Sequence, residues 1–278
     1  MTLRDIESIL AGAGIESAKS DALRLAESAS GLSRASLLAR YGEDISDLHW
    51  FRQLSDMAAR RARREPLQYI LGKWEFYGDE YTVTPDVLIP RPETEMLVDY
   101  ALAHLPHSPV IADLCCGSGC IGIAVCRNTD AHCDSVDISG AALRVAAQNA
   151  LSLGVGDRIK FMHGDVLRGT LLHGTYDMII SNPPYVKTSE MAELSPELSF
   201  EPSIALDGGG DGMMFYRRII EDYSENLTPG GVFLFEIGRD LGDDMTSLAE
   251  RHGFSADILP DLAGLPRMAV LSRSKTDR

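Results

Sequence analysis

The chain has 278 residues, of which 45% are hydrophobic and 24% charged, values typical of a soluble globular protein with room for two domains. Its formal net charge of −15 argues against a broad phosphate-binding surface and fits a basic protein partner better. No apolar stretch approaches the roughly 20 residues that span a bilayer, and the amino terminus does not resemble a signal peptide. We therefore expect a cytoplasmic protein and, by default, a monomer.

Residues 1 to about 70 have a helical pattern. Apolar residues repeat at helical spacing from Leu3 to Leu10 and stop before Gly12. Further helices are predicted around Ala22–Ala26, over Leu32–Ala39, and from about Ser46 to Arg64. The last of these carries a basic run, typical of a solvated helix end, although an acidic partner is the alternative: Arg60, Arg61, Arg63 and Arg64.

A strand pattern follows in residues 71–89. Aromatic residues on both sides of Gly78-Asp79 predict a β-hairpin. The proline-rich loop Ile89–Glu95 then leads into a predicted helix over Met96–Leu105.

The remainder alternates strands and helices, which predicts a parallel sheet covered on both faces. The predicted strands are Val110–Leu114, Cys133–Asp137, Ile159–His163, Met178–Ser181 and Val232–Ile237, with a final pair at Ala256–Pro260 and Arg267–Leu271. The predicted helices are Ile121–Arg127, Ala141–Leu153, Met213–Asn226 and Leu241–His252.

A glycine-rich loop follows the first of these strands. Gly117, Gly119 and Gly122 satisfy G-x-G-x-x-G, and Asp137 ends the next strand, a pattern that suits either a nicotinamide cofactor or S-adenosylmethionine. Asp113 at the mouth of the loop would repel a pyrophosphate but attract the ammonium and sulfonium charges of S-adenosylmethionine. Asp165, after the third strand, could accept a hydrogen bond from an adenine amino group. We therefore expect S-adenosylmethionine.

Five cysteines, an odd number, gather in and after this loop, from Cys115 to Cys133. In a reducing compartment we expect them to be free thiols. They lack the paired C-x2-C spacing of a zinc site, so we predict no metal.

The motif Asn182-Pro183-Pro184-Tyr185 follows the apolar run Tyr176–Ser181. The end of a parallel strand is where ligands bind in an open sheet. The Asn182 carbonyl can accept from an NH2 group, the prolines restrict the loop, and Tyr185 offers a flat face. The motif thus predicts a site for a planar amide or amine, although a proline-rich turn is the structural alternative.

Taken together, these segments resemble the PrmC/HemK family, methyltransferases that modify the glutamine of the Gly-Gly-Gln motif in peptide chain release factors. The resemblance covers nearly the whole chain, and its segments are Arg63–Gly72, Leu88–Glu95, the glycine loop, Asn182–Tyr185, Glu201-Pro202 with Ala205-Leu206, and Glu236-Ile237-Gly238. One departure is Cys115, which stands where the family usually has glycine; Val166 stands where an aromatic residue is frequent.

The resemblance implies an α/β fold, a Rossmann-like class I S-adenosylmethionine-dependent methyltransferase sheet with a small all-helical N-terminal domain. The implied domains are a helical release-factor-binding domain (1–72), a β-hairpin linker (73–89) and the methyltransferase domain (90–278). The expected cofactor contacts are Asp113, Cys115, Cys116, Gly117, Ser118, Gly119, Asp137, Asp165, Val166 and Asn182.

The expected reaction is methyl transfer from S-adenosylmethionine to the side-chain amide nitrogen of the Gly-Gly-Gln glutamine of class 1 release factors. Asn182 to Tyr185, including Pro184, would bind the substrate. The Asn182 oxygen and the Pro183 carbonyl would accept the two amide N–H bonds, and Tyr185 would pack on the amide plane, which makes Asn182, Pro183 and Tyr185 the expected catalytic residues.

Three other hypotheses about the function remain open at this point. A methyltransferase acting on an amino group of a nucleic-acid base shares the motif, but the acidic composition gives no obvious basic cleft. A noncatalytic S-adenosylmethionine-binding protein would have no use for Asn182 and Tyr185. A nicotinamide oxidoreductase is the last.

Overall fold

The computed structural model describes residues 1–274, which divide into two compact units. The helical unit consists of Met1–Lys73 together with Ser195–Phe200. The sheet unit consists of Trp74–Leu194 and the chain from Glu201 onward. The chain therefore leaves the sheet unit for one short stretch and then returns to it.

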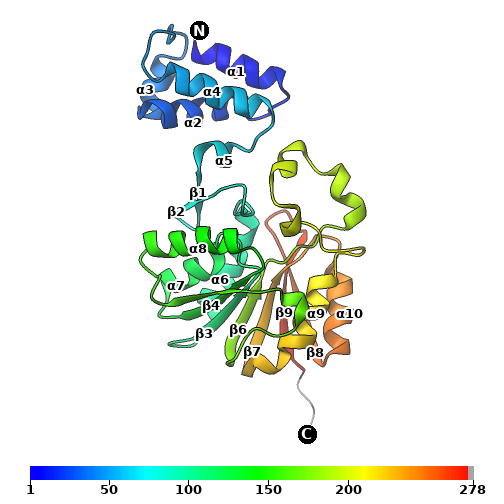
Figure 1. Ribbon diagram of the computed structural model, residues 1–278. Helices are drawn as coiled ribbons and strands as arrows, with labels where there is room; N and C mark the ends of the chain where they lie inside the picture. Colours follow the sequence, from blue (N-terminus) through cyan, green and yellow to red (C-terminus); the bar gives the residue numbers. More distant parts are fainter. Residues whose placement is uncertain (275–278) are drawn as a thin grey trace. The chain divides into compact units, whose positions relative to one another are not determined.

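The helical unit packs its helices around one apolar core (Figure 1). The helices are α1 (Leu3–Gly12), α2 (Ala18–Ser30), α3 (Arg34–Ala39), α4 (Phe51–Ala62) and the short α5 (Leu67–Leu71), which the sequence pattern did not predict. Thr2 caps α1 in a capping box with Asp5, which satisfies the first free N–H groups of the helix. Leu10, Leu25 and Leu54 are fully buried where the helices meet.

The fourth helix begins at Phe51, later than the predicted Ser46. The amino group of Met1 donates to the Asp44 carboxylate at 2.9 Å and to the Ser46 hydroxyl at 2.7 Å. Ser46 also donates its own N–H to Asp44. These side-chain contacts give the backbone an alternative to the helix, so the segment stays a turn.

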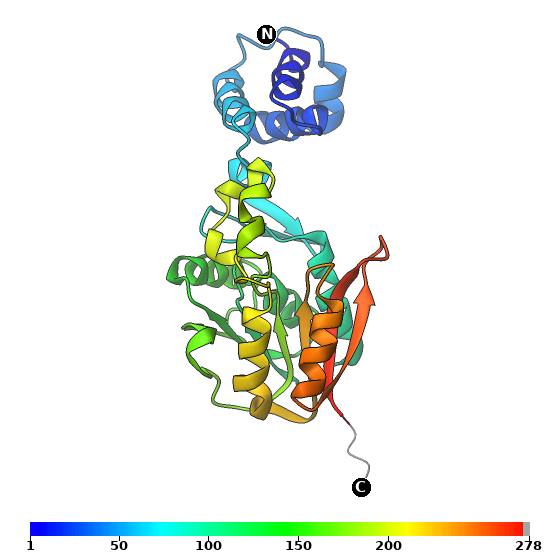
Figure 2. The same cartoon turned by 90° about the vertical axis from the view of Figure 1, so that its right-hand side faces the viewer.

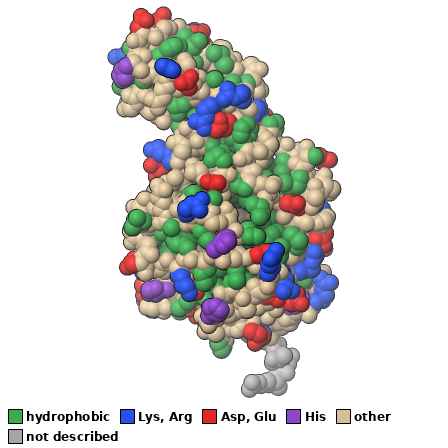
Figure 3. Space-filling model, in the orientation of Figure 1, with side chains coloured by type: hydrophobic (Ala, Val, Ile, Leu, Met, Phe, Trp, Pro, Cys, Tyr) green, Lys and Arg blue, Asp and Glu red, His purple; other side chains and the backbone are tan. Residues whose placement is uncertain are grey.

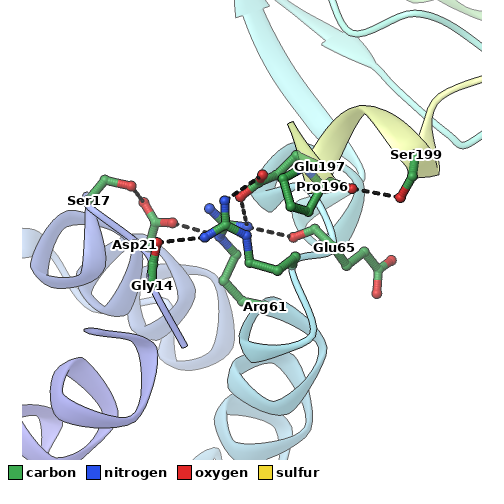
Figure 4. A network of polar contacts seen from close by, with 9 residues as sticks. Gly14, Ser17, Asp21, Arg61, Glu65, Pro196, Glu197 and Ser199 are labelled. Carbon is green, nitrogen blue, oxygen red and sulfur yellow. Dashed lines mark hydrogen bonds and ion pairs between the residues drawn. The ribbon is translucent and has the colours of Figure 1, made fainter. Parts of the chain in front are cut away.

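The arginines at the end of α4 differ in their surroundings, from buried Arg61 to exposed Arg63. Arg61 is 7% exposed; its Nε donates to Asp21 at 2.8 Å and a terminal nitrogen donates to Glu197 at 3.2 Å (Figure 4). Arg64 donates to the other Glu197 oxygen at 2.8 Å, and Arg60 pairs with Glu65. These three arginines therefore have acidic partners in their own chain. The solvated interpretation was wrong for Arg61, which is buried, whereas the side chains of Arg60 and Arg64 stay partly exposed.

The sheet unit is built on a sheet in the order β5-β4-β3-β6-β7-β9-β8. Its strands are β3 (Val110–Leu114), β4 (His132–Asp137), β5 (Ile159–His163), β6 (Tyr176–Ser181), β7 (Leu227–Glu236), β8 (Phe254–Pro260) and β9 (Pro266–Arg273). Strands β3 to β7 pair in parallel, and β9 pairs antiparallel with both β7 and β8. The predicted strands and the final pair are confirmed.

Helices cover both faces of this sheet (Figures 1 and 2). On one face lie α6 (Glu95–His104), α7 (Cys120–Asn128) and α8 (Gly140–Ser152), and on the other α9 (Met214–Tyr223) and α10 (Gly242–Arg251). Two apolar cores result, as expected for a parallel sheet buried on both sides. Among residues 1–274, no helix is both long and apolar enough to cross a membrane.

The predicted hairpin is present as β1 (Lys73–Phe76) and β2 (Asp79–Thr82). Its turn residues Tyr77 and Gly78 have φ of 50° and 77°, the left-handed backbone that a two-residue hairpin turn requires.

The strand order reverses between β3 and β6. From β3 the chain continues to β4 and β5 on one side, while β6 and β7 lie on the other. Loops that leave the two central strands diverge at such a point and open a crevice at the carboxyl ends. Beyond β6 the chain forms the 3-10 turns η3 (Thr188–Glu193), η4 (Pro196–Phe200) and η5 (Ser203–Ala205); others are η1 (Pro92–Thr94), η2 (Val166–Arg168) and η6 (Ser224–Asn226).

Candidate active site

A cavity of about 340 Å³ lies where β3, β4, β5 and β6 end, within the size range of small-molecule sites. The sequence-predicted residues that line it are Cys115, Gly117, Asp137, Asp165, Val166, Asn182 and Pro184. Other parts of its wall, which the motifs did not indicate as a site, come from Asp86–Leu88, Ile138-Ser139, Ala142, Gly164, Leu167, Pro202–Ala205, Asp207 and Met214-Phe215.

The charge of this wall is one-sided. Four carboxylates line the cavity (Asp86, Asp137, Asp165 and Asp207), and the described lining includes no Lys, Arg or His. A pyrophosphate would meet repulsion from every charged group in the wall, whereas a cation would be attracted. The residues therefore fit S-adenosylmethionine, with its sulfonium and ammonium charges and donor hydroxyl and amino groups, and do not fit a dinucleotide.

The glycine loop is held to β4 by hydrogen bonds. The Asp137 carboxylate accepts the Gly117 N–H and the Ser139 N–H, each at 2.8 Å, and Cys116 N donates to the Val136 carbonyl at 3.0 Å. Burial raises the pKa of Asp137, against the hydrogen bonds that lower it. The backbone at Cys115 is left-handed, with φ of 62°, a conformation that glycine adopts more readily than cysteine.

Asp113 lies behind the loop and does not line the cavity. It is fully buried; one carboxylate oxygen accepts the Gly122 N–H at 3.1 Å, and the other has no hydrogen-bond partner. Burial raises the pKa of Asp113 to about 7. Cys116, Ser118 and Gly119 are also buried away from the lining. Direct cofactor contact by these four residues stays a prediction.

A polar residue of α8 supports the loop and was missed by the sequence patterns. Asn149 is 2% exposed; its NH2 group donates to the Ser118 carbonyl at 3.0 Å and the Thr82 carbonyl at 3.1 Å. Its oxygen accepts the Thr82 N–H at 2.8 Å. It thereby joins the glycine loop to the hairpin strand β2. An isolated amide on an otherwise apolar helix face was the only signal for it.

The Asn-Pro-Pro-Tyr motif leaves β6 beside the cavity. Asn182 lines it and donates through Nδ2 to the Thr94 hydroxyl at 3.3 Å. Pro183 is buried and Tyr185 half-buried; neither lines the cavity. The Tyr185 hydroxyl donates to Glu236 at 3.2 Å. The motif is therefore anchored from behind by side chains of η1 and β7, not only by its own prolines.

The part of the cavity wall formed by Pro202–Ala205 follows a buried acid, Glu201, that holds it in place. Glu201 is 6% exposed; it accepts the Ile89 N–H at 3.0 Å and pairs with Arg91. These contacts hold the loop before α6 against the chain that continues into Pro202–Ala205. They give a physical reason why the two segments, known above only from a resemblance, occur together.

On the face drawn in Figure 3, the described Lys and Arg side chains are interspersed with acidic ones and do not follow a single stripe. A basic stripe is the usual electrostatic footprint of a nucleic-acid-binding protein.

Comparison with known proteins identifies the family. Residues 2–72 match the PrmC N-terminal domain, and residues 93–227 match the methyltransferase small domain. The chain is 41% identical to the release factor glutamine methyltransferase of Neisseria gonorrhoeae, over 91% of this chain and 92% of that protein. The chain belongs to the release factor glutamine methyltransferase family. It is also 39% identical to the Moorella thermoacetica member, over 98% of this chain and 99% of that one.

Membership in this family makes the protein an S-adenosylmethionine-dependent methyltransferase, in agreement with the acidic cavity. A methyltransferase from Pyrococcus furiosus shares the fold, with a TM-score of 0.56 at 14% identity, over 78% of this chain and 99% of that one. The Rossmann-like fold predicted from the sequence is confirmed.

Proposed function

We propose that this protein transfers a methyl group from S-adenosylmethionine to the side-chain amide nitrogen of the glutamine in the Gly-Gly-Gln motif of class 1 peptide chain release factors. The relatives named above support the substrate, and Asn182 at the wall of an acidic cavity supports the chemistry. Release factors act on the ribosome, so the activity belongs to the cytoplasm.

Asn182 carries the proposal. Its Nδ2 donates to Thr94, so its Oδ1 is the amide atom left to accept an N–H bond from a ligand. The lone pair of an amide nitrogen is delocalised into its carbonyl, which makes it a weak nucleophile. Acceptors on its N–H bonds pull electron density onto nitrogen and fix its direction. We assign the second acceptor to the Pro183 carbonyl.

The bound cofactor supplies the methyl group as an electrophile. The substrate nitrogen gains that methyl group in exchange for one proton, which passes to solvent. The chain's own contribution is placement, because holding a nucleophile at attack distance lowers a barrier by roughly 7–11 kcal/mol. We assign Tyr185 to packing on the amide plane, and Cys115, Gly117, Asp137, Asp165 and Val166 to the cofactor.

The test combines the protein, a bacterial class 1 release factor and methyl-labelled S-adenosylmethionine, with the label located by peptide mass spectrometry. We expect label on the Gly-Gly-Gln glutamine and none on a release factor in which that glutamine is replaced by alanine. Asn182→Ala should lose most of the label while cofactor binding stays partly intact. Wild-type protein that binds the cofactor but leaves the glutamine unlabelled would overturn the proposal, and methylation of an RNA or DNA base would replace it.

The helical unit is proposed to hold the release factor. Its match to the PrmC N-terminal domain supports this assignment, and the apolar side chains that it exposes include Ile9 (45%) and Leu38 (46%). Ile9→Glu and Leu38→Glu should raise KM for the whole release factor without changing KM for a short Gly-Gly-Gln peptide. An equal change with both substrates would argue against a docking role.

A further inference from the structure

A buried carboxylate stands behind the Asn-Pro-Pro-Tyr motif. Glu236 ends β7 and is 2% exposed. Its two side-chain oxygens accept from two hydroxyls, Oε2 from Thr94 at 2.5 Å and Oε1 from Tyr185 at 3.2 Å. An acid this deeply buried is costly unless it is paired with donors. Its contacts lead to both ends of the motif, to Tyr185 directly and to Asn182 through Thr94, so they indicate a role there.

The first contact sets the direction of the Asn182 amide. A threonine hydroxyl has a single hydrogen, and Thr94 gives it to Glu236. The Thr94 oxygen can then only accept from Asn182, so Asn182 must turn its NH2 group toward Thr94. The Asn182 amide oxygen then points away from Thr94. If Glu236 did not accept, the Thr94 hydrogen could point to Asn182 and favour the flipped amide, which presents NH2 to a ligand.

The second contact holds the last residue of the motif. Tyr185 has no other side-chain hydrogen bond in the described structure, and its hydroxyl donates to Glu236. One carboxylate thus fixes both ends of the four-residue motif, and both contacts require it to accept. Burial raises the pKa of Glu236, opposed first by the Thr94 hydrogen bond and then by the charge of Arg267.

We propose that Glu236 and Thr94 are positioning residues for the methyl transfer: together they orient the Asn182 amide so that its oxygen faces the substrate N–H. This inference rests on the proposed function, and it adds a chain of contacts that begins outside the motif. Without this chain of contacts, Asn182 would keep its place after β6 but lose its preferred amide direction.

The decisive comparison is Thr94→Val against Thr94→Ser. Valine has the same shape without the hydroxyl, whereas serine keeps the hydroxyl. We expect Thr94→Val to lower kcat about 100-fold, the scale of a misplaced reacting group, with Kd for S-adenosylmethionine changed less than about threefold. Thr94→Ser should be at least about ten times as active as Thr94→Val. Glu236→Met should resemble Thr94→Val, because it removes the acceptor that holds the Thr94 hydrogen.

A second readout is independent of turnover. In 15N-labelled protein, the side-chain NH2 signals of Asn182, assigned by their loss in Asn182→Ser, should move or broaden in Thr94→Val and stay in place in Thr94→Ser. Should wild-type protein fail to methylate the release factor, the proposed function falls while this spectrum still tests the orientation. Should Thr94→Val not fold, Glu236→Met gives the same comparison. Wild-type kcat or unchanged Asn182 signals in a folded variant would overturn the inference.

Discussion

The backbone of Gly208 packs directly against that of Tyr185. A Cβ atom added at Gly208 would lie 2.6 Å from the Tyr185 Cα and 2.7 Å from the Pro184 carbonyl oxygen. Both are backbone atoms, so they cannot move aside as the end of a flexible side chain would. The glycine-rich segment 208–212 therefore acts as a backing for the Asn-Pro-Pro-Tyr motif.

Gly208→Ala should consequently displace the motif. We expect a loss of about 1–3 kcal/mol in the free energy of unfolding, as for other overpacked sites, and a fall in kcat of about 100-fold. The matched control is Gly210→Ala, because Gly210 has nothing within 4 Å of an added Cβ; it should change stability by less than about 0.5 kcal/mol. Equal activity of the two variants would show that the close contact does not position the motif.

Cys115 gives a prediction about strain in the cofactor loop. Its φ of 62° is unfavourable for residues with a side chain and worst for β-branched ones. Cys115→Val should lower the free energy of unfolding by about 1–3 kcal/mol and weaken cofactor binding. Cys115→Gly should remain as stable as wild type, since relief of strain offsets the added chain entropy. Thermal unfolding and calorimetric Kd values check both, and a fully stable Cys115→Val would contradict the strain.

The sequence was sufficient to predict those elements that are specified by residues close together in the chain. Alternating apolar runs and turn residues predicted the sheet, the hairpin and the loops that end at the cavity, because strands and tight turns are specified by near neighbours. It did not indicate contacts between distant segments: the Glu236–Thr94 pair, the Asn149 bridge or the Gly208 packing. Each joins residues far apart in the chain, and only the fold brings them together.

The arginines at the end of α4 are a second case in which the sequence could not reveal a distant partner. Charged residues at a helix end look alike in sequence whether they face water or a buried acid. Glu197, which both Arg61 and Arg64 contact, is more than a hundred residues away along the chain, and Asp21, the other acidic partner of Arg61, is 40 residues away. The one local hint was the composition of the run itself, which could not distinguish the two outcomes.

Asp113 gives a prediction about pH. Its pKa in the folded protein is about 7 because it is buried, whereas an unfolded aspartate titrates near 3.9. Between these values the folded state holds more protons than the unfolded state, so stability falls as pH rises from about 4 to about 7, by at most about 1.4 kcal/mol per pH unit.

Asp113→Asn removes this titration while keeping an oxygen to accept the Gly122 N–H. We therefore expect the difference in free energy of unfolding, variant minus wild type, to increase from pH 5 to about pH 7 and to level off between pH 7 and pH 8. The difference between the two proteins cancels the titration of all other acids. A difference that is constant across this range would mean that Asp113 is already ionised near pH 5.

The buried Arg61–Asp21 pair gives a prediction about the helical unit. Arg61→Met removes the charge that compensates Asp21, which is 4% exposed. Loss of one partner of a buried pair costs about 3–5 kcal/mol, whereas replacement of both by apolar residues is often nearly neutral. We expect the double variant Asp21→Leu/Arg61→Met to be more stable than Arg61→Met alone, as measured by denaturant unfolding.

Glu197→Gln tests what the ion pairs between Glu197 and the arginines Arg61 and Arg64 contribute to the stretch Ser195–Phe200. Arg61 would keep Asp21 and the Glu65 carbonyl as partners, so we expect a loss of only about 1 kcal/mol, the scale of a partly exposed ion pair. The stretch lies in the chain between the Asn-Pro-Pro-Tyr motif and the cavity residues Pro202–Ala205. If the ion pairs of Glu197 help to order that wall, Glu197→Gln should reduce the binding free energy of the cofactor by more than it reduces the free energy of unfolding. An unchanged Kd would show that Glu201, with Ile89 and Arg91, is sufficient to hold the wall.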